Sequence, residues 1–221
     1  MIHLQRKTIQ QKFDGSFFAS QNIKNSTRSL GVTFLDALQE FVDNSLDANA
    51  QNIVIGIKKG ENYPEIIVQD DGDGIPINPA KDFNAKELGE DGLRYCLAFG
   101  GRLADPERQS TLIGKFGWGL SQSAACQSIR TEVYTKTREE KSHRYNYIDL
   151  DELDQNNILP ETINKKDPYS DYEVPFLSLL GLVDSGTVIV LKECDNLEWK
   201  NIDTLVMKAV NRLSEVYRKY I

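Results

Sequence analysis

The sequence contains no apolar run long enough to span a bilayer, and its start, MIHLQRKTIQ, is not a signal peptide. Its three cysteines, Cys96, Cys126 and Cys194, are far apart and match no zinc motif. We therefore expect reduced thiols, a cytoplasmic location and no membrane contact. The formal net charge of −7 disfavours a dedicated nucleic-acid-binding surface, although a local basic patch is compatible with it.

Internal repeats and low-complexity tracts are also lacking from the 221 residues, which can form one large domain or two small ones. Hydrophobic periodicity predicts helices and strands in mixed order, and this order favours a layered α/β domain with helices packed on one sheet. The predicted helices cover about residues 33–49 and 199–217, and a glycine-rich turn opens a further helix within 114–129. The predicted strands cover 52–59, 65–72, 130–137, 143–150 and 186–193.

Three stretches lack a long regular pattern. Residues 1–29 are predicted to be an N-terminal arm, and residues 151–181 an irregular insertion punctuated by prolines, within a domain that spans 30–221. The stretch 78–113 contains only a short helical piece near 92–100, and a loop of this length is usually functional or mobile. We expect the last helix to turn its apolar side to the core, with these residues: Trp199, Ile202, Leu205, Val206, Ala209, Val210, Leu213, Val216 and Tyr217.

The stretch ALQEFVDNSLDANA, residues 37–50, places Glu40, Asp43, Asn44 and Asp47 on one predicted helix. At 100° per residue these four side chains share an arc of roughly 100° opposite the apolar side. A solvated face would explain them, but no Lys or Arg is interleaved, and Asp and Asn disfavour helix interiors. The alternative is a functional face, where a carboxylate activates water and an amide oxygen holds a hard cation such as Mg²⁺.

A glycine-rich acidic turn, VQDDGDGIP at residues 68–76, follows a predicted strand. Gly72 and Gly74 allow the backbone to bend tightly and to approach a ligand closely. Asp70 stands at the strand end, where its carboxylate can accept a hydrogen bond from an exocyclic amine. The stretch is neither an EF-hand loop nor a Rossmann fingerprint, and an ordinary acidic turn is the alternative.

A second glycine loop, GKFGWGLSQSA at residues 114–124, precedes a predicted helix. Gly114, Gly117 and Gly119 can expose backbone N–H groups at the helix start, where the helix dipole favours a phosphate, and Lys115 adds a positive charge. The spacing is not that of a Walker A loop. Tight packing of the helix on a strand would explain the glycines equally well.

Together and in this order, these stretches resemble the nucleotide-binding motifs of the GHKL superfamily, which joins the gyrase B subunit, the ninety-kilodalton heat-shock chaperone, histidine kinases and MutL. ExxDNxxDA resembles the first motif, DDGDGIP the second and GKFGWG the lid motif, and SGTVIVL at 185–191 resembles the fourth. The form EFVDNSLDA is nearest to MORC-type and MutL-type members. The resemblance implies a Bergerat-type two-layer α/β sandwich, with helices on one face of a mixed sheet and an ATP lid at 78–113.

The resemblance also implies residue roles. Glu40 would be the general base that orients water onto the γ-phosphate, and Asn44 would bind Mg²⁺. Asp70 would accept the adenine amine and thereby select ATP over GTP, supported by Thr187. The implied ATP-binding residues come from the helix, the turn, the lid and the strand: Asn44, Asp47, Ala48, Asp70, Gly72, Gly74, Ile75, Lys115, Phe116, Gly117, Trp118, Gly119, Leu120 and Thr187.

The implied function is Mg²⁺-dependent ATP hydrolysis that drives lid closure and homodimerisation in a larger protein. A downstream transducer domain or partner chain would supply a lysine, so we expect slow or absent turnover by this chain alone and nucleic-acid contact only through other domains. One alternative is a nucleotide-binding sensor or scaffold without hydrolysis. A histidine-kinase-like domain is the other, but such kinases generally lack the glutamate, and neither His3 nor His143 lies in a helical dimerisation pattern.

Overall fold

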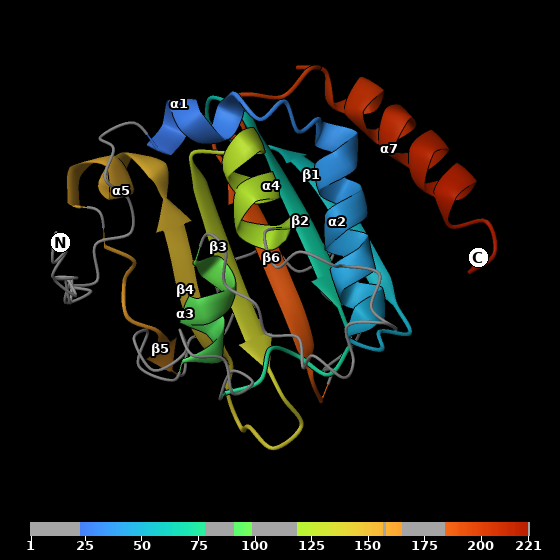
Figure 1. Cartoon of the computed structure of the whole chain (residues 1–221). Helices are drawn as coiled ribbons and strands as arrows, with labels where there is room; N and C mark the ends of the chain where they lie inside the picture. Colours follow the sequence, from blue (N-terminus) through green and yellow to red (C-terminus); the bar gives the residue numbers. More distant parts are fainter. Residues whose placement is uncertain (1–22, 78–90, 99–118, 157, 165–183, 221) are drawn as a thin grey trace, which may run out of the picture.

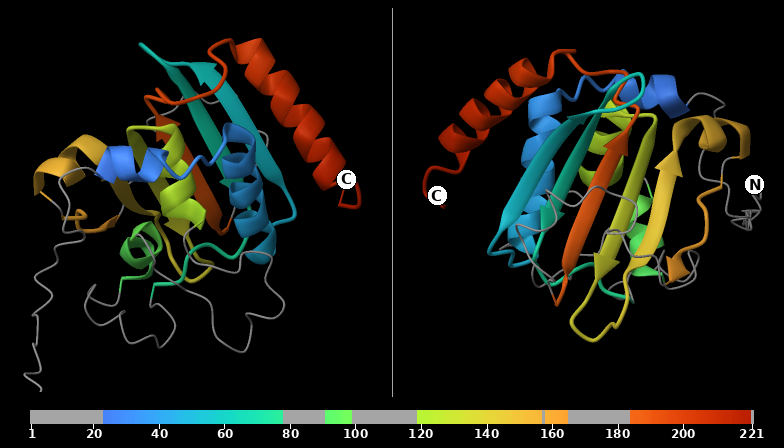
Figure 2. Two further views of the ribbon diagram at one scale, coloured as in Figure 1. Left: turned by 45° about the horizontal axis from the view of Figure 1, so that its top comes forward. Right: turned by 180° about the vertical axis from the view of Figure 1, so that it is seen from behind.

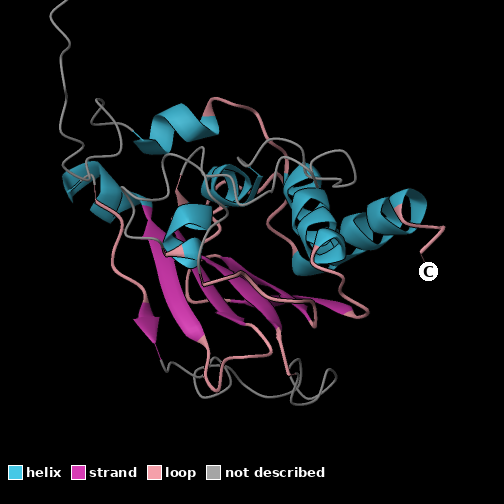
Figure 3. Cartoon of the chain, turned by 60° about the horizontal axis from the view of Figure 1, so that its bottom comes forward, coloured by secondary structure: helices cyan, strands magenta, loops and turns pink. Residues whose placement is uncertain are grey.

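The computed structural model describes residues 23–77, 91–98, 119–156, 158–164 and 184–220 (Figure 1). A single sheet carries most of the helices on one face, so the described chain forms two layers (Figure 3). The strands are β1 (Ile53–Lys59), β2 (Pro64–Asp70), β3 (Arg130–Lys136), β4 (Arg144–Asp149), β5 (Ile163–Asn164) and β6 (Gly186–Lys192). The predicted two-layer α/β architecture is confirmed.

The six strands follow the order β1-β2-β6-β3-β4-β5. All pairings among the described strands are antiparallel, so the prediction of a mixed sheet is wrong for this part of the chain. β6 comes late in the sequence, yet it lies in the middle of the sheet between β2 and β3. This insertion brings segments more than 100 residues apart onto neighbouring strands.

The described helices are α1 (Ile23–Arg28), α2 (Phe34–Asp47), α3 (Gly92–Leu97), α4 (Gly119–Gln127), α5 (Leu150–Asn156) and α7 (Ile202–Val216). None of them is both long and apolar enough to cross a membrane. α2 and α4 lie side by side over the sheet, whereas α7 lies beside α2 and β1 at one edge (Figures 1 and 2).

The start of α2 is fixed by a capping box. The Thr33 hydroxyl accepts a hydrogen bond from the Asp36 N–H at 3.2 Å, and the Asp36 carboxylate accepts one from the Thr33 N–H at 3.4 Å. Behind this cap, Phe34, Leu38 and Phe41 are buried in the main core between helices and sheet. The opposite side of α2 is thereby left to its acidic and amide residues.

Strand alternation divides the sheet side chains between its two faces. Ile66 and Val68 of β2 join the main core under the helices, whereas Ile67 joins a smaller cluster with Tyr134 and Val190 on the other face. Asp70 has the same parity as Ile66 and Val68. Its side chain therefore projects toward the helices.

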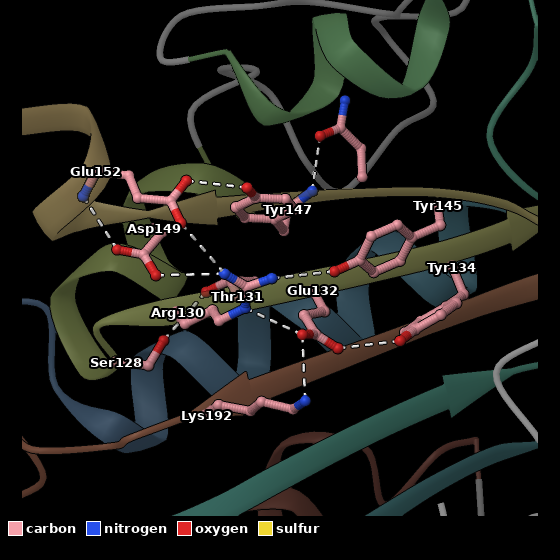
Figure 4. A network of polar contacts seen from close by, with 11 residues as sticks. Ser128, Arg130, Thr131, Glu132, Tyr134, Tyr145, Tyr147, Asp149, Glu152 and Lys192 are labelled. Atoms are coloured by element: carbon pink, nitrogen blue, oxygen red, sulfur yellow. Dashed lines mark hydrogen bonds and ion pairs between the residues drawn. The ribbon is translucent and has the colours of Figure 1, made fainter. Parts of the chain in front are cut away.

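The other face of the sheet also carries a paired network of charges and tyrosines (Figure 4). The Glu132 carboxylate accepts hydrogen bonds from Arg130, Lys192 and Tyr134 at 3.0–3.1 Å. The Arg130 guanidinium lies 3.8 Å from the centre of the Tyr147 ring. These contacts join β3, β4 and β6 and leave Glu132 engaged with three donors, so we regard the network as structural.

Two predicted irregular regions contain helices. α1 occupies the end of the predicted arm, where Ile23 is buried against α4 and α5 and its N–H donates to Asp154 at 2.6 Å. α5 begins the predicted insertion and buries Leu153. Each helix has few apolar residues, so its burial depends on contacts distant in sequence. The other residues of these two predictions, 1–22, 157 and 165–181, lie outside the described residues.

The prediction for the last helix is only partly correct. Leu205, Ala209 and Tyr217 are buried, but Val206 and Val210 are 41% and 56% exposed. Among the described elements the helix makes its main contacts with α2 and β1, and these cover a narrow stripe of the apolar side. Hydrophobic spacing predicts the direction of an apolar face but not how much of it is covered.

Candidate nucleotide site

A polar row crosses the helix-facing side of the sheet at the end of β2. Asp70 is paired with Thr187 of β6, which is paired with Thr135 of β3, which is paired with Arg144 of β4. The hydroxyls of Thr135 and Thr187 lie 3.1 Å apart. Antiparallel register thus places a carboxylate, two hydroxyls and a guanidinium side by side on the face of the sheet that α2 covers.

Asp70 is 5% exposed and sits among fixed hydrogen-bond donors. Its Oδ1 accepts from the N–H groups of Gly72 at 3.0 Å and Thr187 at 3.1 Å, and its Oδ2 accepts from the Ser45 hydroxyl at 3.0 Å. Burial raises the pKa of Asp70, and these three hydrogen bonds partly offset that rise. An ionised carboxylate offers about four acceptor positions, so roughly one is left for a further donor.

The glycine turn after β2 packs against the end of α2. A Cβ at Gly72 would lie 2.6 Å from the carbonyl oxygen of Ala48, so only glycine allows this approach. Gly74 has φ +74°, a conformation that glycine adopts without strain, and a Cβ there would meet the backbone of Lys136. Gly72 therefore packs between Ala48 and the Asp70 carboxylate, whereas Gly74 packs against the end of β3.

The far end of this turn is bound to the same polar row. The Ile75 N–H donates to the Thr135 hydroxyl at 2.8 Å, and the Arg144 guanidinium donates to the Ile75 carbonyl. Arg144 is held in turn by Glu140 at 2.7 Å. The turn that carries Asp70, Gly72, Gly74 and Ile75 is consequently attached to the sheet at both ends.

The C-terminal end of α2 packs against this turn, and the same helix carries the acidic face. Glu40, Asp43, Asn44 and Asp47 are all partly buried, which does not fit a simple solvated face. Burial raises the pKa of Glu40, and the negative charges of Asp43 and Asp47 raise it further. A carboxylate of this kind is a stronger base than an exposed glutamate.

Gly119, the first residue of α4, lies directly against Glu40. A Cβ at Gly119 would overlap the Glu40 carboxylate, so glycine is required for Glu40 to occupy its place. Leu120 follows and packs against the main core. The start of α4 is therefore fixed beside the predicted base, although Lys115, Phe116, Gly117 and Trp118 of the same motif lie outside the described residues.

We expect Gly119→Ala to displace the Glu40 carboxylate and to lower any phosphate release from ATP by about 10²-fold or more, the scale of a misplaced general base. Ala is a better helix former than Gly, so α4 itself should remain stable. Phosphate release and circular dichroism of the variant would check this. Wild-type phosphate release by the folded variant would contradict the assignment.

Sequence reasoning missed three residues at or next to this site. The Ser45 hydroxyl donates a hydrogen bond to Asp70, and the Thr135 hydroxyl accepts one from the Ile75 N–H in the turn. Tyr217, at the end of α7, donates a hydrogen bond to Asp43. Ser45 carries a detectable sign, since it is a polar residue on the otherwise apolar side of α2. Thr135 and Tyr217 reach the site only through strand register and helix packing, which a local pattern does not contain.

A Mg²⁺ ion bound together with a nucleotide needs few protein ligands, because water and phosphate oxygens supply the others. The described residues hold no group of three or more His, Cys, Asp or Glu side chains that could bind a metal by themselves. The partly buried amide of Asn44, on the face of α2 that carries Glu40 and Asp47, fits such a minimal ligand set.

Comparison with known proteins identifies the class. Residues 32–174 match the family described as histidine kinase-, DNA gyrase B-, and HSP90-like ATPase, and the chain belongs to this family. The match covers the acidic helix, the glycine turn and the lid motif. No curated protein matches the chain.

A solved structure with a similar fold is the topoisomerase IV ATP-binding domain of Francisella tularensis, determined in complex with a small-molecule inhibitor. The two share 18% sequence identity with a TM-score of 0.51 over 86% of this chain. The aligned region is 46% of that chain, so this sequence spans about half of its length. At this identity the similarity shows the ATP-binding-domain fold alone.

Proposed function

We propose that this chain is the Mg²⁺-dependent ATP-binding and ATP-hydrolysing domain of a GHKL-type ATPase. The observation that carries the proposal is the environment of Asp70, a buried carboxylate with about one acceptor position left beside a close-packed glycine turn. Family membership gives the ligand class, and Glu40 on the neighbouring helix gives a base for hydrolysis.

Asp70 would select the base of the nucleotide. Its carboxylate accepts a hydrogen bond from the exocyclic amine of adenine, and Thr187 supports it from the adjacent strand. At the ring position of this amine, guanine carries a carbonyl oxygen, which is an acceptor. It would face the Asp70 carboxylate, also an acceptor, with no proton between them to form a hydrogen bond. Leaving such groups unpaired is costly, so ATP is favoured over GTP.

Glu40 would act on the phosphate end. Its carboxylate orients a water molecule toward the γ-phosphate and accepts a proton from it, aided by the raised pKa that burial and two acidic neighbours produce. Asn44 would hold Mg²⁺, which neutralises phosphate charge when it is bound. The remaining predicted contacts would surround the nucleotide from the end of α2, the glycine turn and the start of α4. They are Asp47, Ala48, Gly72, Gly74, Ile75, Gly119 and Leu120.

Isothermal titration calorimetry of this chain with a non-hydrolysable ATP analogue, with and without Mg²⁺ and beside the GTP analogue, tests the proposal. We expect binding of the ATP analogue, strengthened by Mg²⁺, and little binding of the GTP analogue. Equal affinity for both analogues would contradict the role of Asp70. Absence of binding by the folded chain would contradict the nucleotide site itself.

The proposal extends to an ATP-dependent conformational cycle. ATP would close a lid within 78–113 and favour association of two copies, because contacts to the γ-phosphate exist only in the closed state. Of this stretch the structure describes residues 91–98, where α3 packs in the main core, and the rest of the predicted lid lies outside the described residues. A transducer domain or partner chain would complete the site. Size-exclusion chromatography with the ATP analogue tests this step, and an unchanged elution volume would contradict association by this chain.

A further inference from the structure

The Thr135 hydroxyl joins three segments of the candidate nucleotide site. Its oxygen lies 2.8 Å from the Ile75 nitrogen, 3.2 Å from the Gly186 carbonyl oxygen and 3.1 Å from Thr187 Oγ1. These partners belong to the glycine turn and to the start of β6, and the Thr135 side chain between them is 0% exposed. A hydroxyl has one proton and two lone pairs, so three contacts use its full hydrogen-bonding capacity.

The chemistry of two partners fixes the direction of the third hydrogen bond. The Ile75 N–H can only donate, so it takes one lone pair of Thr135. The Gly186 carbonyl can only accept, so it takes the single Thr135 proton. All three contacts are then satisfied only if the Thr187 hydroxyl donates to the remaining lone pair, and leaving a buried polar contact unmade is costly.

This direction decides what the site offers to a ligand beside Asp70. Thr187 lies between Asp70 and Thr135 in the polar row, so its proton points away from Asp70. Among the described residues, Thr135 is the one hydrogen-bond partner of the Thr187 hydroxyl. Thr187 therefore presents lone pairs, as an ionised Asp70 does. Two neighbouring acceptors favour a ligand group that has protons to donate, and they disfavour a carbonyl oxygen.

We propose that Thr135 is a specificity-determining positioning residue, which orients the Thr187 hydroxyl so that this end of the site accepts hydrogen bonds. The inference rests on the proposed function, because it concerns how the same site distinguishes adenine from 6-oxopurine nucleotides. Since Thr135 is completely buried, its effect on the nucleotide passes through Thr187.

The test is Thr135→Val, which keeps the shape of the side chain and removes the hydroxyl. Thr187 can then turn its proton toward the carbonyl oxygen of a 6-oxopurine. Calorimetric titration compares non-hydrolysable analogues of ATP and inosine triphosphate, and the ratio of their Kd values is the readout. We expect the preference for the ATP analogue to narrow by about 2- to 10-fold, the scale of one neutral hydrogen bond. Loss of the Ile75 contact should weaken both analogues alike and cancel in the ratio.

Thr131→Val is the matched control, because it makes the same change on the same face of β3. Thr131 is 2% exposed, and its hydroxyl lies 3.0 Å from Ser128 Oγ, which does not belong to the turn. We expect its Kd ratio to equal that of the wild type. Thr135→Ser retains the hydroxyl and should also retain the ratio. In a Thr187→Val background, Thr135→Val should leave the ratio unchanged, because the residue that carries the effect is absent.

An unchanged Kd ratio in folded Thr135→Val would overturn the inference. An equal change of the ratio with and without the Thr187 hydroxyl would also overturn it, since that result indicates packing alone. A wild-type chain that binds neither analogue would instead contradict the proposed function.

Neutron diffraction from wild-type crystals grown in heavy water tests the hydrogen-bond direction without any nucleotide. We expect the Thr187 deuterium to lie between Thr187 Oγ1 and Thr135 Oγ1, and the Thr135 deuterium to point to the Gly186 carbonyl. A Thr187 deuterium that points away from Thr135 would overturn the inference even if the ATP analogue binds. Failure of the inference is thereby distinguished from failure of the proposed function.

Discussion

Glu40→Gln should reduce phosphate release from ATP by about 10²- to 10⁴-fold while the affinity for ATP stays near its wild-type value. The amide preserves the size of the side chain beside Gly119 but cannot accept a proton from water. A loss confined to the chemical step is the result expected for a general base. The measurement is single-turnover phosphate release, with calorimetric titration of the ATP analogue on the same preparation.

Glu61→Gln provides the matched control, because it makes the same chemical change in the exposed turn between β1 and β2. We expect both readouts of this variant to equal those of the wild type. Wild-type phosphate release by Glu40→Gln would contradict the catalytic role and would favour a nucleotide-binding sensor without hydrolysis. Loss of ATP binding in Glu40→Gln would instead place Glu40 in ground-state recognition.

The same substitution should stabilise the fold at neutral pH. Since the pKa of Glu40 is raised above its ordinary value of 4.5 in the folded chain, its stabilising contribution exists below pH 4.5 and is lost as the pH rises through the folded value. Ionised Glu40 therefore weakens the native state near pH 7. We expect the thermal midpoint of Glu40→Gln to be higher than that of the wild type at neutral pH, alongside the loss of turnover. The difference between the two midpoints should decrease toward acidic pH.

The elements that support this site could be predicted from sequence because their patterns are local. The helix predicted at 33–49 is α2 (Phe34–Asp47), since its capping box and apolar spacing are both contained in one short stretch. The strand predicted at 186–193 is β6 (Gly186–Lys192), a continuous apolar run. Motif order then indicated the family without any knowledge of contacts.

The interior of the site could not be predicted in the same way. The partner of Asp70 on β6, Thr187, was named by resemblance, but the register that extends the row to Thr135 depends on β6 entering between β2 and β3. The contact of Tyr217 with Asp43 depends on how α7 lies against α2. Such long-range choices are decided by packing of the whole domain, and no window of sequence records them.

Asp70→Asn should weaken binding of the ATP analogue by about 1.5–3 kcal/mol, or roughly 10- to 150-fold in Kd, because a charge-assisted acceptor is lost. The N–H groups of Gly72 and Thr187 hold the amide oxygen at the position of Oδ1. The amide NH₂ then takes the other position, where it opposes the adenine amine with a second donor. Calorimetric titration with ATP and GTP analogues measures the effect.

Nucleotide selectivity sharpens this test beyond a simple loss of affinity. An NH₂ group at Oδ2 can donate to the guanine carbonyl, so the preference for ATP over GTP should narrow in Asp70→Asn. Asp73→Asn is the control in the same turn, where the carboxylate accepts only from Asn49 Nδ2, at 2.5 Å, among the described contacts. If Asp73→Asn weakened binding equally, disturbance of the turn would explain both variants; if Asp70→Asn bound the ATP analogue normally, the base would lie elsewhere.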